Sequence, residues 1–197
     1  MSFSYQQEIN RKLIHLSSVI YPILYVFIDK FQMLWIFSIV LFILLVWEIS
    51  RLKAIPIKFL RFLDYFIKPK EKECRLSGAT YFLLAIFLTV LLFNKTIAIL
   101  AMLILVFCDT AAALIGRKFG KIKILDKSLE GLLAFIISGI LVIWLYFFIF
   151  SINIIYFVPA LIALTAAAFT ELISNKIKID DNLSVILVFA TLLNLWL

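Results

Sequence analysis

The chain has 197 residues, 65% of them hydrophobic, and a formal net charge of +7. Since a soluble domain is about 45–50% apolar, this composition and the mean hydropathy of +1.13 exclude a soluble protein and predict an integral membrane protein. In such a protein, positive charge indicates orientation and contact with anionic lipid, so we expect the bilayer as a partner and no nucleic acid.

The apolar runs indicate membrane-spanning helices. They are about 16–20 residues long, whereas the strands of a membrane barrel are shorter and alternate in polarity. The first run lacks a small-residue cleavage site, so we expect no cleavable signal peptide. We predict one all-α domain over residues 1–197, a transmembrane helix bundle with seven spans: Leu13–Ile28, Met33–Ile49, Ala79–Phe93, Thr96–Ile115, Leu129–Phe150, Ile154–Ile173 and Leu183–Leu197.

Charge along the chain predicts the orientation. All basic residues except Lys30 and Lys95 either precede the first span or lie in three loops. These loops connect the second span to the third, the fourth to the fifth, and the sixth to the seventh. The positive-inside rule therefore places the N-terminus in the cytosol and the C-terminus outside. Both cysteines, Cys74 and Cys108, then lie on the cytosolic side, where a disulfide is not expected.

Acidic residues follow the same division, since only Asp29 falls on the outer side. Channels and transporters need polar groups along the path or near the midplane. Polar chemistry confined to one face is instead typical of an enzyme that joins a lipid headgroup to a cytosolic co-substrate. We expect the active site on the cytosolic face, at the inner membrane if the cell is prokaryotic.

The loop after the second span contains its own element. Residues Ile57–Ile67, following Pro56, alternate between a polar and an apolar face, which predicts an amphipathic helix in the headgroup layer. It is either a surface anchor or a lateral gate for a lipid. Before this loop, Glu48 and Arg51 are three residues apart, which favours a local salt bridge.

The stretch Phe107–Gly120 contains a carboxylate inside an apolar run. Asp109, Ala112, Ala113 and Gly116 recur at helical spacing and form a small face. An ionisable group at this depth costs roughly 2.5–3.5 kcal/mol on insertion. We interpret Asp109 as a metal ligand or a base; the alternative is an ion pair with a basic residue on another helix. Two glycines and a basic loop follow, which suits magnesium and phosphate.

The N-terminal segment carries a second polar group. Glu8, Arg11, Lys12 and His15 fall on one helical face. Arg11 and Lys12 are either a topology signal or phosphate ligands. His15, the only histidine, is either a packing residue or a phosphate-facing residue.

Three further motifs stand at the ends of spans. Ser77-Gly78 opens the third span, as a helix cap or an anion site. Lys127–Gly131 opens the fifth with free amides suited to phosphate, although its spacing is not that of a Walker loop. Glu171 ends the sixth span and Asp180–Asn182 opens the seventh, either as caps or as carboxylates for a magnesium nucleotide.

Taken together, these segments resemble the polyprenol kinase family, which includes dolichol, phytol and farnesol kinases and the CTP-dependent diacylglycerol kinase of yeast type, and which is related to phosphatidate cytidylyltransferase. Cys108 departs from the pattern, because glycine is expected before the aspartate. The matching pieces are Glu8-x-x-Arg11-Lys12-x-x-His15, Ser77-Gly78-Ala79-Thr80-Tyr81, the run Asp109–Gly120, Lys127-Ser128-Leu129-Glu130-Gly131, and Glu171 with Asp180-Asp181-Asn182-Leu183.

The resemblance implies transfer of the γ-phosphoryl group of CTP to the hydroxyl of a membrane isoprenoid alcohol or of diacylglycerol, with Mg²⁺. The candidate catalytic residues are Asp109, Glu130 and Lys127. The candidate nucleotide and phosphate ligands are Arg11, Lys12, His15, Thr80, Gly116, Arg117, Lys118, Gly120, Ser128 and Gly131. The candidate metal ligands are Asp109, Glu171, Asp181 and Asn182.

Two other functions stay open from the sequence. One is a CTP-dependent cytidylyltransferase that forms a CDP-lipid and releases pyrophosphate. The other is a small lipid-binding or transport protein without catalysis, against which the scarcity of polar residues on the outer side argues. Assembly as a monomer or a homodimer is also open.

Overall fold

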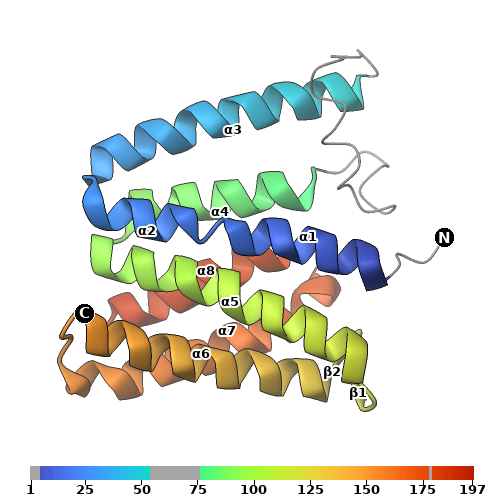
Figure 1. The fold of residues 1–197 in the computed structure, drawn as a ribbon, viewed down its shortest axis with the longest axis vertical. Coiled ribbons are helices and arrows are strands. Elements are labelled where there is room, and N and C mark those ends of the chain that lie inside the picture. Colours follow the sequence, from blue (N-terminus) through green and yellow to red (C-terminus); the bar gives the residue numbers. More distant parts are fainter. Residues whose placement is uncertain (1–4, 54–75, 178) are drawn as a thin grey trace.

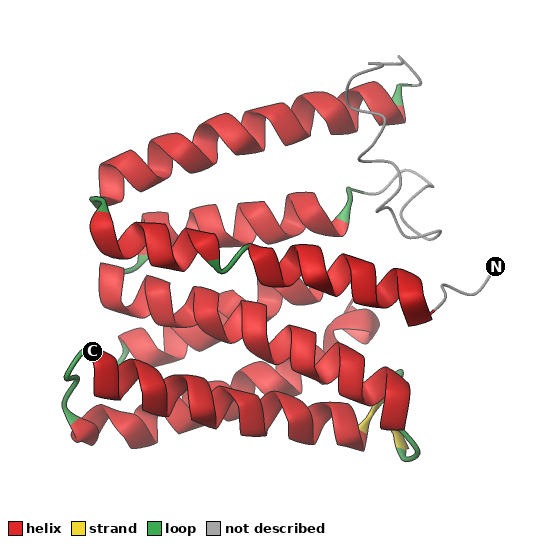
Figure 2. Cartoon of the chain, viewed as in Figure 1, coloured by secondary structure: helices red, strands yellow, loops and turns green. Residues whose placement is uncertain are grey.

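The structure, a computed structural model, describes residues 5–53, 76–177 and 179–197. Figures 1 and 2 show a bundle of helices that run between two ends of the molecule; α1 begins at one end and α8 finishes at the other. The elements are α1 (Tyr5–Ser17), α2 (Ile20–Phe27), α3 (Lys30–Leu52), α4 (Gly78–Leu92), α5 (Lys95–Phe119), β1 (Lys123–Ile124), β2 (Lys127–Ser128), α6 (Leu129–Ile149), the 3-10 helix η3 (Ile154–Tyr156), α7 (Phe157–Ile177) and α8 (Asp181–Asn194).

The all-α prediction is confirmed for the described residues, and four segments are long and apolar enough to cross a membrane. These are α3, α5, α6 and Ile154–Ser174, while α4 and α8 are apolar but shorter. We therefore describe the chain as an integral membrane protein. The seven-span count and the orientation stay predictions, and the predicted surface helix at Ile57–Ile67 lies outside the described residues.

Lys30 and Lys95, the two basic residues that the charge pattern sets apart, bind the C-terminal ends of neighbouring helices. Lys95 Nζ donates to the carbonyl oxygens of Val26 and Ile28 at 3.0 and 2.9 Å, and Lys30 Nζ donates to that of Phe93 at 3.2 Å. Because the last carbonyls of a helix have no intrahelical partner, these lysines stabilise the ends of α2 and α4. This role explains why the two basic residues stand apart from the others.

Helix α5 forms the centre of the core. It contacts α1, α2, α4, α6 and α8, and most of its length, including Ile97, Leu100 and Ile104, is buried. Because lipid tails are as apolar as these side chains, close van der Waals packing of this helix on all sides, and not a hydrophobic driving force, stabilises the bundle. It also carries Asp109 into the interior.

Two glycines set the distance between α5 and α6. A Cβ atom on Gly131 would lie 3.0 Å from the carbonyl oxygen of Ala112 and 3.2 Å from the Cα atom of Gly116. Both neighbours are backbone atoms, so they cannot rotate away. Glycine is required here because the two helix backbones approach each other directly.

Gly131→Ala is expected to destabilise the protein by about 1–3 kcal/mol, the usual cost of overpacking a core. Unfolding in detergent measures this. Gly139→Ala tests a second close approach: its Cβ would lie 2.3 Å from Cδ1 and 3.0 Å from Cγ of the buried Leu164 side chain, so it should also destabilise the protein. Equal melting temperatures for Gly131→Ala and the parent protein would contradict the close approach.

The predicted first span is two helices. A turn at Ser18–Val19 separates α1 from α2. The Ser18 hydroxyl donates to the carbonyl oxygen of His15, and the Ser17 hydroxyl donates to that of Ile14 at 2.7 Å. Side-chain bonds of this kind compete with the helical ladder and bend helices.

The basic loop also differs from the predicted one. Helix α5 continues to Phe119, so Gly116, Arg117 and Lys118 are helical and the loop begins at Gly120. A two-stranded antiparallel hairpin, in which Lys123 pairs with Ser128, then leads into α6. Its turn places Leu125 at a φ of 58°, in the left-handed region that two-residue hairpins require.

Candidate active site

Three carboxylates from three helices converge at one end of the bundle. Asp109 from α5, Glu171 from α7 and Asp181 at the start of α8 each offer an oxygen, and these oxygens lie within 4.8 Å of one another. We call this group the acidic cluster. Asp109 and Glu171 are 7% and 4% exposed. Carboxylate oxygens are the ligands that Mg²⁺ prefers, so the donor set fits the metal expected from the sequence.

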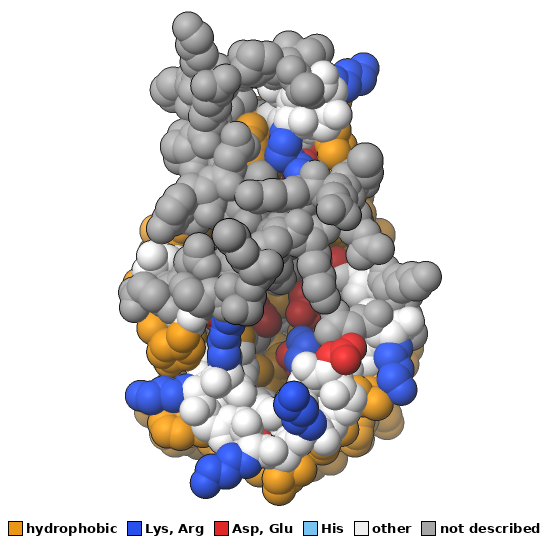
Figure 3. Space-filling view, turned by 90° about the vertical axis from the view of Figure 1, so that its right-hand side faces the viewer, with side chains coloured by type: hydrophobic (Ala, Val, Ile, Leu, Met, Phe, Trp, Pro, Cys, Tyr) orange, Lys and Arg blue, Asp and Glu red, His pale blue; other side chains and the backbone are white. Residues whose placement is uncertain are grey.

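Lys127 joins two members of the acidic cluster. Its Nζ forms an ion pair with Glu171 and lies 3.2 Å from Asp181 Oδ2. Burial lowers the pKa of Lys127, but the negative charges of Asp181 and Glu171 outweigh it, and the pKa is raised above its ordinary value. The group is therefore a permanent cation. Figure 3 shows basic side chains around acidic ones at this end of the molecule.

Asp109, the third member of the acidic cluster, contacts two side chains of α1. Lys12 is 1% exposed, and its ammonium group forms an ion pair with Asp109. His15 Nε2 lies 3.3 Å from Asp109 Oδ2 and 3.4 Å from the Leu105 carbonyl oxygen. The structure therefore places Lys12 in the interior on a carboxylate, where the sequence predicted a phosphate ligand.

Arg11 and Arg117 meet through a shared carboxylate. Glu8 is 6% exposed. Its Oε1 lies 2.5 Å from Arg11 Nη2, and its Oε2 lies 3.3 Å from Arg117 Nη1. This links α1 to the end of α5. Lys118 is exposed, and its Nζ lies 5.1 Å from the ring centre of Phe119. The three basic groups stand at the same end of the bundle as the acidic cluster, but nearer to the surface.

The start of α6 is tied to the end of α5. Ser128 Oγ caps α6 by accepting the amide of Gly131 at 3.1 Å, and it lies 3.4 Å from the Gly116 carbonyl oxygen. The Leu129 amide donates to the carbonyl oxygen of Ile122 at 2.9 Å. These amides already have partners, so the predicted phosphate ligands Ser128 and Gly131 have a structural role here.

Gly120 and Glu130 complete this junction. The Gly120 amide donates to the Gly116 carbonyl oxygen at 3.1 Å and ends α5. Glu130 Oε1 accepts the amides of Lys121 and Ile122 at 2.9 and 3.3 Å. Glu130 thus supports the hairpin and is not a member of the acidic cluster. Its assignment as a base stays a prediction.

The predicted salt bridge between Glu48 and Arg51 is confirmed at 2.5 Å, and Glu48 does more than bind this arginine. It is 1% exposed and accepts the amide of Ser77 at 2.6 Å and the hydroxyl of Thr80 at 2.9 Å. Ser77 caps α4. The structure therefore uses Thr80, a predicted phosphate ligand, to join α3 to α4.

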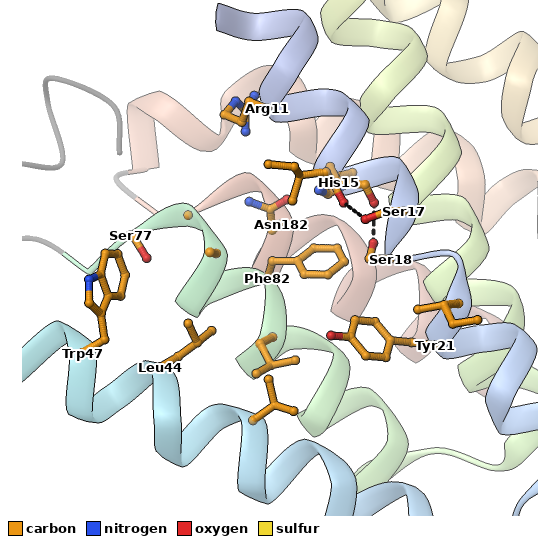
Figure 4. Close-up of a pocket in the computed structure, with 16 residues that line it drawn as sticks. Arg11, His15, Ser17, Ser18, Tyr21, Leu44, Trp47, Ser77, Phe82 and Asn182 are labelled. Atoms are coloured by element: carbon orange, nitrogen blue, oxygen red, sulfur yellow. Dashed lines mark hydrogen bonds between the residues drawn. The ribbon is translucent and has the colours of Figure 1, made fainter. Parts of the chain in front are cut away.

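A cavity of about 520 Å³ lies between α1, α2, α3 and α4. Figure 4 shows Arg11, His15 and Asn182 together at one end, with Tyr21 and Leu44 farther away. Most of the lining is apolar. Asn182, at the start of α8, belongs to this cavity as well as following Asp181 in the chain. Sequence reasoning missed the cavity, because its walls come from five helices whose packing no local pattern specifies.

Comparison with known proteins gives three informative relatives. The chain is 34% identical over 182 residues to Uncharacterized protein RP860 of Rickettsia prowazekii, which covers 90% of this chain and 89% of that protein. It is 29% identical over 166 residues to CTP-dependent diacylglycerol kinase 1 of Saccharomyces cerevisiae, covering 80% of this chain and 54% of the kinase. The kinase of the same name from Schizosaccharomyces pombe is 31% identical over 98 residues, covering 47% of this chain and 45% of the kinase.

The chain thus spans about half the length of the yeast kinases it matches. No family model matches the chain. No solved structure matches it significantly.

Proposed function

The chain belongs to the same protein family as RP860 of Rickettsia prowazekii, and from its similarity to the CTP-dependent diacylglycerol kinases we propose that it is a membrane lipid kinase. It transfers the γ-phosphoryl group of CTP to the hydroxyl of a lipid alcohol, either diacylglycerol or an isoprenoid alcohol. The observation that carries the proposal is the acidic cluster, which three helices assemble at the polar end of an apolar bundle.

The charges at this end suit phosphoryl transfer. Such a reaction needs positioning and stabilisation of phosphate charge more than covalent chemistry by the protein. Asp109, Glu171 and Asp181 would hold Mg²⁺, which when bound neutralises phosphate charge. Lys127 keeps the carboxylates of α7 and α8 together. Arg11, Arg117 and Lys118, nearer the surface, would bind the phosphates of CTP by charge-assisted hydrogen bonds.

In the proposed reaction one bond to phosphorus forms, one breaks, and one proton is transferred. The lipid hydroxyl oxygen forms a bond to the γ-phosphorus while the bond from that phosphorus to the β-phosphate oxygen breaks. The hydroxyl proton passes to a carboxylate of the acidic cluster, and CDP leaves. Because CTP is cytosolic, we place this end of the bundle at the cytosolic face.

A labelling assay tests the proposal. Purified protein in lipid vesicles receives Mg²⁺, γ-labelled CTP or ATP, and phytol, farnesol, a polyprenol or diacylglycerol. We expect the γ label in the lipid and free CDP. A cytidylyltransferase would instead place an α label in the lipid and release pyrophosphate. Asp126→Asn, which changes an exposed carboxylate of the hairpin, is the control. Failure of every alcohol to take up γ label would overturn the proposal.

A further inference from the structure

The body of the cavity suits a hydrocarbon chain. Val40 and Leu44 of α3 and Phe82 and Leu83 of α4 line it. On the α1–α2 side the lining residues Ile14, Ser17 and Ile20 are exposed, so no part of the described ranges 5–53, 76–177 and 179–197 buries them. In a helix bundle within a bilayer, an apolar opening of this kind faces acyl chains. A chain can therefore enter sideways without leaving the hydrocarbon layer.

The polar end of the cavity offers one unused acceptor. Asn182 is 5% exposed, and its buried Oδ1 atom has no hydrogen-bond partner among the residues that the structure describes. Its Nδ2 donates to Asp180 Oδ1 at 2.9 Å, which fixes the orientation of the amide. A carbonyl oxygen needs a donor, so a hydroxyl satisfies it, whereas a fully ionised phosphate or carboxylate has no proton to offer.

The same end adjoins the acidic cluster. His15 lines the cavity and also lies 3.3 Å from Asp109, and Asn182 follows Asp181 in the chain. Figure 4 shows His15 and Asn182 at the same end of the cavity, which both residues line. A hydroxyl bound at Asn182 is thus held next to the carboxylates that accept its proton in the reaction proposed above.

The geometry points to this cavity as the binding site for one hydrocarbon chain of the lipid alcohol, with its hydroxyl donating to Asn182 Oδ1. This assignment rests on the proposed kinase function and deepens it. It gives Asn182 a role in binding the alcohol, in place of the metal-ligand role that the sequence suggested.

The first test fills the cavity. Leu44→Trp places a large side chain among the lining residues, and Leu45→Trp makes the same change at the next position, which is 38% exposed and outside the lining. We expect Leu44→Trp to raise the KM for the alcohol roughly tenfold or more, with the KM for CTP unchanged. Leu45→Trp should change neither value. A Leu44→Trp enzyme with the parent KM for the alcohol would overturn the site.

The second test concerns the acceptor. Asn182→Leu keeps the approximate size but removes the carbonyl, and should lower kcat/KM for the alcohol about tenfold, the scale of one lost hydrogen bond. The Mg²⁺ concentration for half-maximal activity should stay the same. If that concentration rises instead while the KM for the alcohol holds, Asn182 is a metal ligand and the assignment is wrong.

A binding experiment separates this inference from the proposed function. A long-chain primary alcohol with a diazirine in its chain is irradiated with the protein in vesicles. Crosslinks should map to Val40, Leu44 and Phe82. Crosslinks confined to the outward residues Phe42 and Leu45 would overturn the cavity as the site, even with an active kinase. Crosslinks in the cavity without phosphorylation of any alcohol would support the site and overturn the kinase.

Discussion

Asp109→Asn is expected to lower phosphoryl transfer by about 10²–10³-fold, the scale of losing one group that stabilises charge in a transition state. The amide keeps the size of the carboxylate but not its charge. The change also leaves the buried ammonium group of Lys12 without its counter-charge. Breaking a buried ion pair costs about 3–5 kcal/mol, so a lower melting temperature should accompany the loss of activity.

A second variant separates these two effects. Lys12→Met with Asp109→Asn removes both charges of the pair, and replacing a whole buried pair is often neutral or stabilising. The double variant should regain the melting temperature of the parent protein while its activity stays low. If the double variant regains activity as well, Asp109 has only a structural role. A stable and fully active Asp109→Asn protein would exclude both roles.

Glu171→Gln is expected to raise the Mg²⁺ concentration for half-maximal activity by at least about 10–100-fold, the scale on which even loss of an outer-shell partner weakens metal binding. A neutral amide binds a hard cation more weakly than a carboxylate, and Glu171 is the most buried member of the acidic cluster. The same shift should appear in the Mg²⁺ concentration that raises the melting temperature, because a ligand that binds the folded state stabilises it. This second readout does not depend on catalysis.

Asp126→Asn is the matched control for this experiment. It makes the same carboxylate-to-amide change at an exposed position of the hairpin, so both Mg²⁺ titrations should match those of the parent protein. A Glu171→Gln enzyme with a lower kcat but unchanged Mg²⁺ titrations would show that Glu171 serves the reaction without binding the metal.

Most of the helices could be predicted from apolar runs, because burial in a bilayer demands long uninterrupted segments. The start of α6 at Leu129 is an example, since Ser128 is a clear cap. The break between α1 and α2 was missed, although the sequence marks it. Pro22, in the first turn of α2, has no amide to donate to the carbonyl oxygen of Ser18, four residues earlier, and its ring clashes with that carbonyl. Serine hydroxyls that bond to the backbone of the preceding turn add to the break. The hairpin was also missed, because leucine rarely adopts the positive φ that Leu125 has.

The candidate site was also predictable only in part. Asp109, Glu171 and Asp181 could be selected because acids in or beside apolar spans are expensive. Their partners could not be assigned from sequence. Lys12 looked like a surface cation, and only the packing of α1 against α5 places it on Asp109. Whether a cation near a helix end binds phosphate or a buried acid depends on such packing.

The pairing of Lys12 with Asp109 has a consequence for synthesis of the chain. The two residues are 97 positions apart, so at ordinary translation rates the lysine leaves the ribosome about 5–20 s before the aspartate. During that interval a lone ammonium group would be costly inside the bilayer. We therefore expect α1 to reach its final depth only after α5 has been made, although α1 is synthesised first.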